Sequence, residues 1–66
     1  MLSFEVRKSS EIQIWCDRAG MKTLLEHLEQ ARKVGHLHMR VGQDLDDKTP
    51  FGDEAAGEVI IDFNDE

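Results

Sequence analysis

Residues 17–35 read "DRAGMKTLLEHLEQARKVG", and this stretch decides the fold class because its periodicity is helical. Apolar residues recur every three or four positions, which predicts an amphipathic helix with one buried stripe. Asp17 can accept hydrogen bonds from the free N–H groups of the first turn, and Gly35 can adopt the left-handed conformation that ends a helix. The predicted buried stripe consists of Met21, Leu24, Leu25, Leu28, Ala31 and Val34.

The segments on both sides of this helix alternate with a period of two, as half-buried strands do. "LSFEVR" (2–7) and "EIQIWC" (11–16) precede it and form a predicted hairpin, while "HLHMRV" (36–41) and "GEVIIDF" (57–63) follow it. The sequence therefore predicts an α+β fold with the order β-β-α-β-β. Its four-stranded, mainly antiparallel sheet has the expected strand order 2-1-3-4, with the helix packed on one face.

The chain is expected to be a single domain, residues 1–66, with a long acidic loop at 42–57 and a frayed tail at 64–66. Chains below roughly 70–80 residues usually need a disulfide, a metal ion or a partner subunit for stability. Cys16 is the only cysteine, so no internal disulfide can form. A metal ion or a partner subunit remains as the additional support, and we expect a homodimer.

The net charge of −6 argues against direct nucleic-acid binding, because phosphate backbones repel an acidic surface. The same charge suits a partner protein with a basic face. No apolar run resembles a signal peptide or reaches the length of a membrane span, so we expect a soluble, cytoplasmic protein without membrane association.

His36 and His38 stand two residues apart in the predicted third strand and project from its outer face. Both could reach one metal ion, with Asp62 or Glu58 of the last strand as a third ligand. Alternation alone places any polar pair in this relation on a solvated face, so ordinary surface histidines are the competing interpretation. The candidate metal ligands are His36, His38 and Asp62.

Trp15 also falls on the outer face, among polar residues. Aromatic residues and arginine are enriched at the centres of protein interfaces, which predicts a contact surface here. A tryptophan partly covered by long neighbouring side chains is the competing interpretation. The predicted homodimer interface consists of Trp15, Gln13, His36, His38, Arg40 and Ile60.

The loop at 42–57 is unusually long for a compact domain, and such loops are often functional. It lacks the ligand pattern of an EF-hand, since Lys48 occupies a ligand position. Leu45 and Phe51 are expected to anchor it to the body. The candidate partner-binding residues are Asp44, Asp46, Asp47, Asp53 and Glu54, with a plain solvated loop as the alternative.

No catalytic residue is assigned. Cys16 lies on the inward face of its strand, where a thiol serves as inert packing, and no nucleophile elbow or glycine-rich phosphate loop is present. We therefore expect a protein that is not an enzyme and that uses no cofactor.

From Asp17 to the end, the chain resembles the small bacterial proteins grouped as immunity protein thirty-two of the polymorphic-toxin systems. The resemblance is carried by "DRAGMKTLLEHL", "GHLHM", an acidic loop containing Leu45, and "EVIIDF". "VGQ" stands where the family's loop often has tryptophan and glycines. The resemblance implies a toxin-neutralising binder, or a relative without an assigned role.

Two functional hypotheses follow. The first is a non-enzymatic, homodimeric interaction domain, of an immunity type whose acidic surface blocks a basic toxin site. The alternative is a small metal-binding protein that uses His36 and His38.

Overall fold

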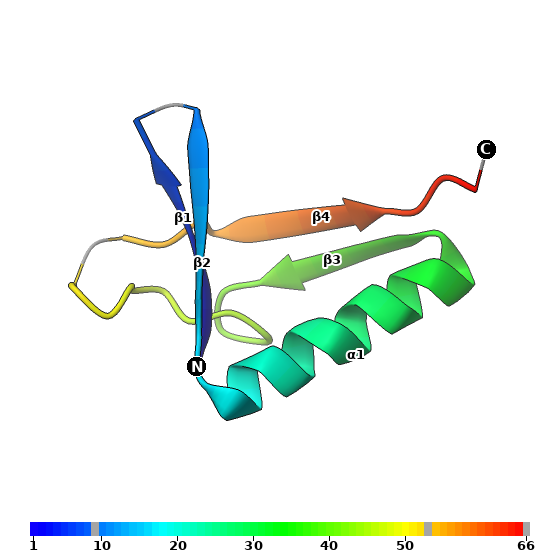
Figure 1. The fold of residues 1–66 in the computed structure, drawn as a ribbon, viewed down its shortest axis with the longest axis horizontal. Coiled ribbons are helices and arrows are strands. Elements are labelled where there is room, and N and C mark those ends of the chain that lie inside the picture. Colours follow the sequence, from blue (N-terminus) through cyan, green and yellow to red (C-terminus); the bar gives the residue numbers. More distant parts are fainter. Residues whose placement is uncertain (9, 53, 66) are drawn as a thin grey trace.

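The computed structural model describes residues 1–8, 10–52 and 54–65 and has the predicted β-β-α-β-β order (Figure 1). Its elements are β1 (Leu2–Arg7), β2 (Glu11–Cys16), α1 (Arg18–Val34), β3 (His36–Arg40) and β4 (Glu58–Asp62). The α+β class and the antiparallel strand pairing are confirmed. The predicted turn at 8–10 and the tail at 64–66 include Ser9 and Glu66, which lie outside the described residues.

The strands form two separate sheets, β1–β2 and β3–β4, where the sequence led us to expect one sheet of order 2-1-3-4. The expected ladder between β1 and β3 is replaced by contacts from the long loop. The Asp46 N–H donates to the Leu2 carbonyl over 2.8 Å, and the Ala56 N–H donates to the Phe4 carbonyl over 2.6 Å. β3 does not pair with β1 because the loop already uses that edge.

Both predicted ends of the helix are present. The Asp17 carboxylate accepts a hydrogen bond of 2.8 Å from the Gly20 N–H, and Gly35 has a φ of 87°, in the left-handed region. The Gly35 N–H closes the last turn on the Ala31 carbonyl. Among the described residues, no helix combines the length and apolarity that crossing a membrane requires.

The predicted helical stripe is only partly correct. Leu24 and Ala31 face the body, but the other four residues are exposed; these are Met21, Leu25, Leu28 and Val34. α1 runs along β3 (Figure 1). Because a two-stranded sheet is narrow, β3–β4 covers only one row of the side chains of α1. His27 belongs to that row, and its Nε2 lies 3.0 Å from Asp44 Oδ1 of the loop.

The buried core is small. Leu2 and Phe4 of β1, Met39 of β3 and Leu45 of the loop form one cluster, against which Leu24 packs. The predicted anchoring of the loop by Leu45 is therefore confirmed. The two small sheets and the loop therefore meet at this cluster.

Candidate interaction surface

The core-side face of the β1–β2 hairpin continues into solvent. Phe4 pairs with Ile14 and Val6 pairs with Ile12, so these side chains share the face that carries the buried Leu2. Figure 1 shows the hairpin standing across one end of β3–β4, with its far end extending beyond β4. Val6 is 64% exposed and Ile12 is 70% exposed, because nothing in the described chain covers this part of the face.

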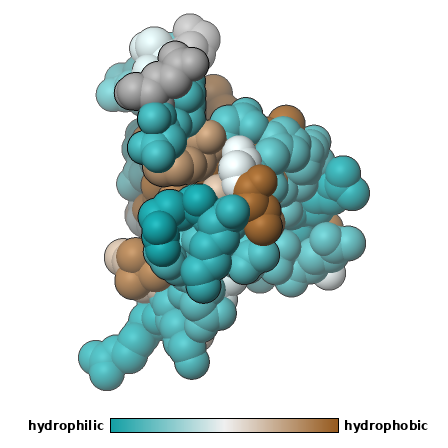
Figure 2. Space-filling model, turned by 90° about the vertical axis from the view of Figure 1, so that its right-hand side faces the viewer, coloured by the Kyte–Doolittle hydropathy of each residue, from teal (hydrophilic) through white to brown (hydrophobic). Residues whose placement is uncertain are grey.

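These side chains form one wall of an open apolar groove of about 440 Å³, which we call the hairpin groove. It lies between the hairpin and the start of β4. The hairpin groove is lined by Phe4, Val6, Ile12, Ile14, Ala56, Glu58 and Val59. Figure 2 shows that apolar side chains reach the molecular surface, with the largest such area in the upper part of that view.

Beside this groove, β4 has an unpaired edge. Phe63 donates its N–H to the Gly35 carbonyl, and the Gly57 carbonyl accepts from Val41, so odd-numbered residues direct their backbone groups toward β3. In an antiparallel strand, the backbone N–H and C=O groups of successive residues point to opposite edges. The backbone groups of Glu58, Ile60 and Asp62 therefore face the outer edge, where no described strand pairs with them.

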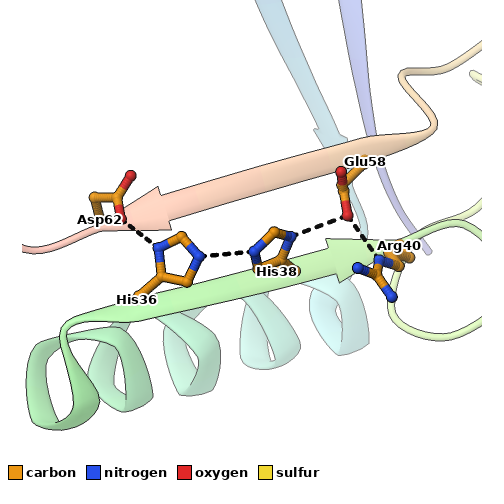
Figure 3. A network of polar contacts seen from close by, with 5 residues as sticks. All are labelled: His36, His38, Arg40, Glu58 and Asp62. Atoms are coloured by element: carbon orange, nitrogen blue, oxygen red, sulfur yellow. Dashed lines mark hydrogen bonds and ion pairs between the residues drawn. The ribbon is translucent and has the colours of Figure 1, made fainter.

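The outer face of β3–β4 carries a linear polar network (Figure 3). His36 Nδ1 lies 2.5 Å from Asp62 Oδ1, and the Nε2 atoms of His36 and His38 are 2.7 Å apart. His38 Nδ1 is 3.0 Å from Glu58 Oε2, which also accepts a 2.6 Å bond from Arg40 Nε. The two imidazoles face away from the buried Met39, as predicted, and their contacts join the two strands.

Arg40 first and His38 second, as hydrogen-bond donors, lower the pKa of the Glu58 carboxyl below its ordinary value. A carboxyl whose pKa is lower in the folded chain than in the unfolded chain stabilises the fold above the unfolded pKa. That contribution is lost as the pH falls through the folded pKa, so this network weakens in acid.

We predict that Arg40→Met raises the pKa of Glu58, because the largest cause of its depression is removed. A carbon-13 NMR titration of the Glu58 carboxyl measures this directly. Arg18→Met, which removes the same charge from α1, is the control and leaves the Glu58 titration in place. Equal midpoints for Glu58 in wild type and Arg40→Met would contradict the role assigned to the guanidinium.

Trp15 lies on the other sheet, apart from the histidines. Its Nε1 donates to Glu5 Oε1 over 3.1 Å, and its ring meets Phe51 edge-on with 5.1 Å between centroids. Phe51 thus touches the body as predicted, although it is itself exposed. The predicted interface is divided: Gln13 and Trp15 belong to β1–β2, whereas its other members belong to β3–β4 and consist of His36, His38, Arg40 and Ile60.

Two of the predicted acidic loop residues have internal roles. Asp44 contacts His27, and the Asp46 carboxylate accepts from the Leu2 N–H over 2.8 Å. Asp47 and Glu54 are exposed. The fifth, Asp53, lies outside the described residues. Asp47 and Glu54 are therefore the described carboxylates of this set that face solvent and have no internal role.

The proposed metal ligands form a line and do not converge. Asp62 meets the Nδ1 atom of His36, on the opposite side of that ring from His38. Among residues 1–8, 10–52 and 54–65, no three His, Cys, Asp or Glu side chains are grouped so as to hold a metal ion.

The hairpin groove was missed by the sequence analysis, which placed Val6, Ile12 and Ile14 in half-buried strands and assigned no site to them. Their alternation correctly gives the face on which they lie. Whether that face is covered depends on how far the hairpin extends beyond the body, which alternation does not encode. The contact of His27 with Asp44 was also missed, because a histidine between leucines carries no signal for a loop 17 residues away.

Comparisons with protein-family models, with curated proteins and with solved structures found no match to this chain. The resemblance to immunity proteins therefore stays a prediction from the motifs.

Proposed function

We propose that the chain is a non-enzymatic protein-interaction domain. The observation that carries this proposal is the hairpin groove beside the unpaired edge of β4. Apolar patches bordered by polar residues mark interaction sites, and an open strand edge favours pairing with another chain. The core of only a few buried side chains also supports stabilisation by a partner.

The specific form that we propose is toxin neutralisation by binding. It is supported by the motif resemblance and by the net charge of −6, which attracts a basic protein surface and speeds the encounter. Asp47 and Glu54 are the loop carboxylates that we assign to this contact. Because such steering acts through charge, binding should weaken as salt is raised.

Co-expression with a toxin encoded beside the gene for this chain tests the role. The wild-type chain should restore growth, and Asp47→Asn/Glu54→Gln should lose protection. Glu26→Gln/Asp65→Asn changes the net charge equally at other exposed positions and should keep it. A neighbouring toxin whose activity is unaffected by the wild-type chain would contradict the proposal, as would equal loss in both double variants.

A second candidate function is transition-metal binding at His36 and His38, favoured by the facing Nε2 atoms. Carboxylates orient both rings through Nδ1, as they do for many metal-bound histidines. A separation of 2.7 Å between the two Nε2 atoms, with metal–nitrogen bonds of about 2.0–2.1 Å, gives an N–metal–N angle of about 80–85°. This angle suits the square or octahedral geometry of Cu²⁺ and Ni²⁺ better than tetrahedral Zn²⁺.

Titration with Cu²⁺ and with Zn²⁺, followed by isothermal titration calorimetry and melting temperature, tests this candidate. It predicts tighter binding of Cu²⁺ and loss of that binding in His38→Gln, with His27→Gln as the control. No response to either ion in the wild-type chain would exclude it.

We also propose that the chain acts as a homodimer, as its size suggested. The predicted contact surface is divided between the two sheets, so a second copy that covers one sheet contacts only part of it.

A further inference from the structure

We propose that a second copy of this chain pairs antiparallel with the free edge of β4 and places its Phe63 in the hairpin groove. This inference rests on the proposed interaction function and names the occupant of its surface. Phe63 lies on the same face as Val59 and Ile61, directly after β4, and is 44% exposed.

The dimensions of the chain favour a partner of this kind. A compact monomer of 7.6 kDa exposes about 4,300 Å², whereas this chain exposes 4902 Å². Its radius of gyration is 12.1 Å, against about 10.8 Å for a compact domain of this length. The chain thus exposes about 600 Å² more surface than a compact monomer. A dimer that covers this excess on both copies buries about 1,200 Å² in total, which is the lower limit for specific interfaces.

The direction of the backbone groups limits the register of this pairing. Glu58, Ile60 and Asp62 offer N–H and C=O groups at the edge, and a two-fold axis beside Ile61 sets Ile60 opposite Asp62 of the second copy. Val59 then faces Phe63 of the second copy, next to the groove that Val59 helps to line. An axis beside Ile60 would instead set Glu58 opposite Asp62, and like charges in that position are destabilising.

The apolar walls of the groove match an aromatic occupant. Val6, Ile12 and Ile14 lie on the core-side face of the hairpin, so an inserted phenyl ring would extend the core formed by Leu2 and Phe4. Each copy carries a charge of −6, so electrostatics oppose the contact between two copies. Added salt should therefore strengthen this dimer, whereas it should weaken the binding of a basic toxin.

Sedimentation equilibrium over a range of concentrations tests the inference. The matched pair is Ile60→Pro and Ile60→Thr: both lose the isoleucine side chain, but only proline removes the outward N–H, which has no role in pairing with β3. We expect a dimer for the wild type and Ile60→Thr, and a monomer for Ile60→Pro that keeps its circular dichroism. Dimerisation of Ile60→Pro equal to that of Ile60→Thr would overturn the edge pairing.

Ile12→Gln provides a second test that leaves β4 unchanged, with Leu25→Gln as the control at a similarly exposed site on α1. Ile12→Gln should weaken dimerisation by at least about tenfold, and Leu25→Gln should not. A wild-type chain that is monomeric at every concentration, but still neutralises a toxin, would remove this inference and leave the proposed function. A dimer without neutralisation would leave the contact and remove the toxin role.

Discussion

Met39→Ala is expected to lower the free energy of unfolding by about 2–5 kcal/mol, the usual cost of truncating a fully buried large side chain. Met39 is 0% exposed and belongs to a core cluster of four buried residues. The total stability expected for 66 residues is about 3–10 kcal/mol. This one substitution should therefore remove a large part of the stability.

Urea denaturation followed by Trp15 fluorescence measures this loss. Leu25→Ala is the matched control, because Leu25 is exposed on α1 and its truncation removes little buried surface. A loss below about 1 kcal/mol for Met39→Ala would show that the core does not close around this side chain.

Gly20→Ala is expected to destabilise the fold by about 1–3 kcal/mol through overpacking, although alanine is the better helix former by about 1 kcal/mol. A Cβ atom at Gly20 would overlap the carbonyl of Met1 and come within 3.1 Å of the Cys16 Cβ. The Met1 carbonyl also accepts the Asp17 N–H at the start of α1. The Met1 carbonyl cannot move away from Gly20 without breaking that hydrogen bond.

Thermal melting by circular dichroism is the measurement for Gly20→Ala. Gly57→Ala is the control, because a Cβ atom there would meet nothing within 4 Å. A melting temperature for Gly20→Ala at or above that of the wild type would show that the start of α1 can move away from β1.

The sequence was sufficient where the signal is local. Asp17 and Gly35 bound the helix through cap chemistry that involves only neighbouring residues, and alternation assigned His36 and His38 to the outer face of β3. These features depend on backbone geometry within a few positions, and all of them are present in the structure.

The rest depends on contacts between distant segments. The backbone N–H groups of Asp46 and Ala56 bond to the edge of β1, where β3 lies in the predicted sheet. Nothing in the sequence near either residue indicates these hydrogen bonds. Similarly, the helix offers more apolar residues than the narrow β3–β4 sheet covers, so Leu24 is half-buried whereas Leu25 is exposed. The hairpin groove follows from the same mismatch in size between elements, since the hairpin is longer than the body that it covers.

Amide hydrogen exchange at low and high protein concentration tests the central claim, that the edge of β4 and the hairpin groove form a contact surface. The N–H groups of Glu58, Ile60 and Asp62 should exchange quickly in dilute protein and more slowly as the concentration rises. Val59 and Ile61, which bond to β3, should be protected at both concentrations. An exchange rate at Ile60 that does not change with concentration would contradict the claim.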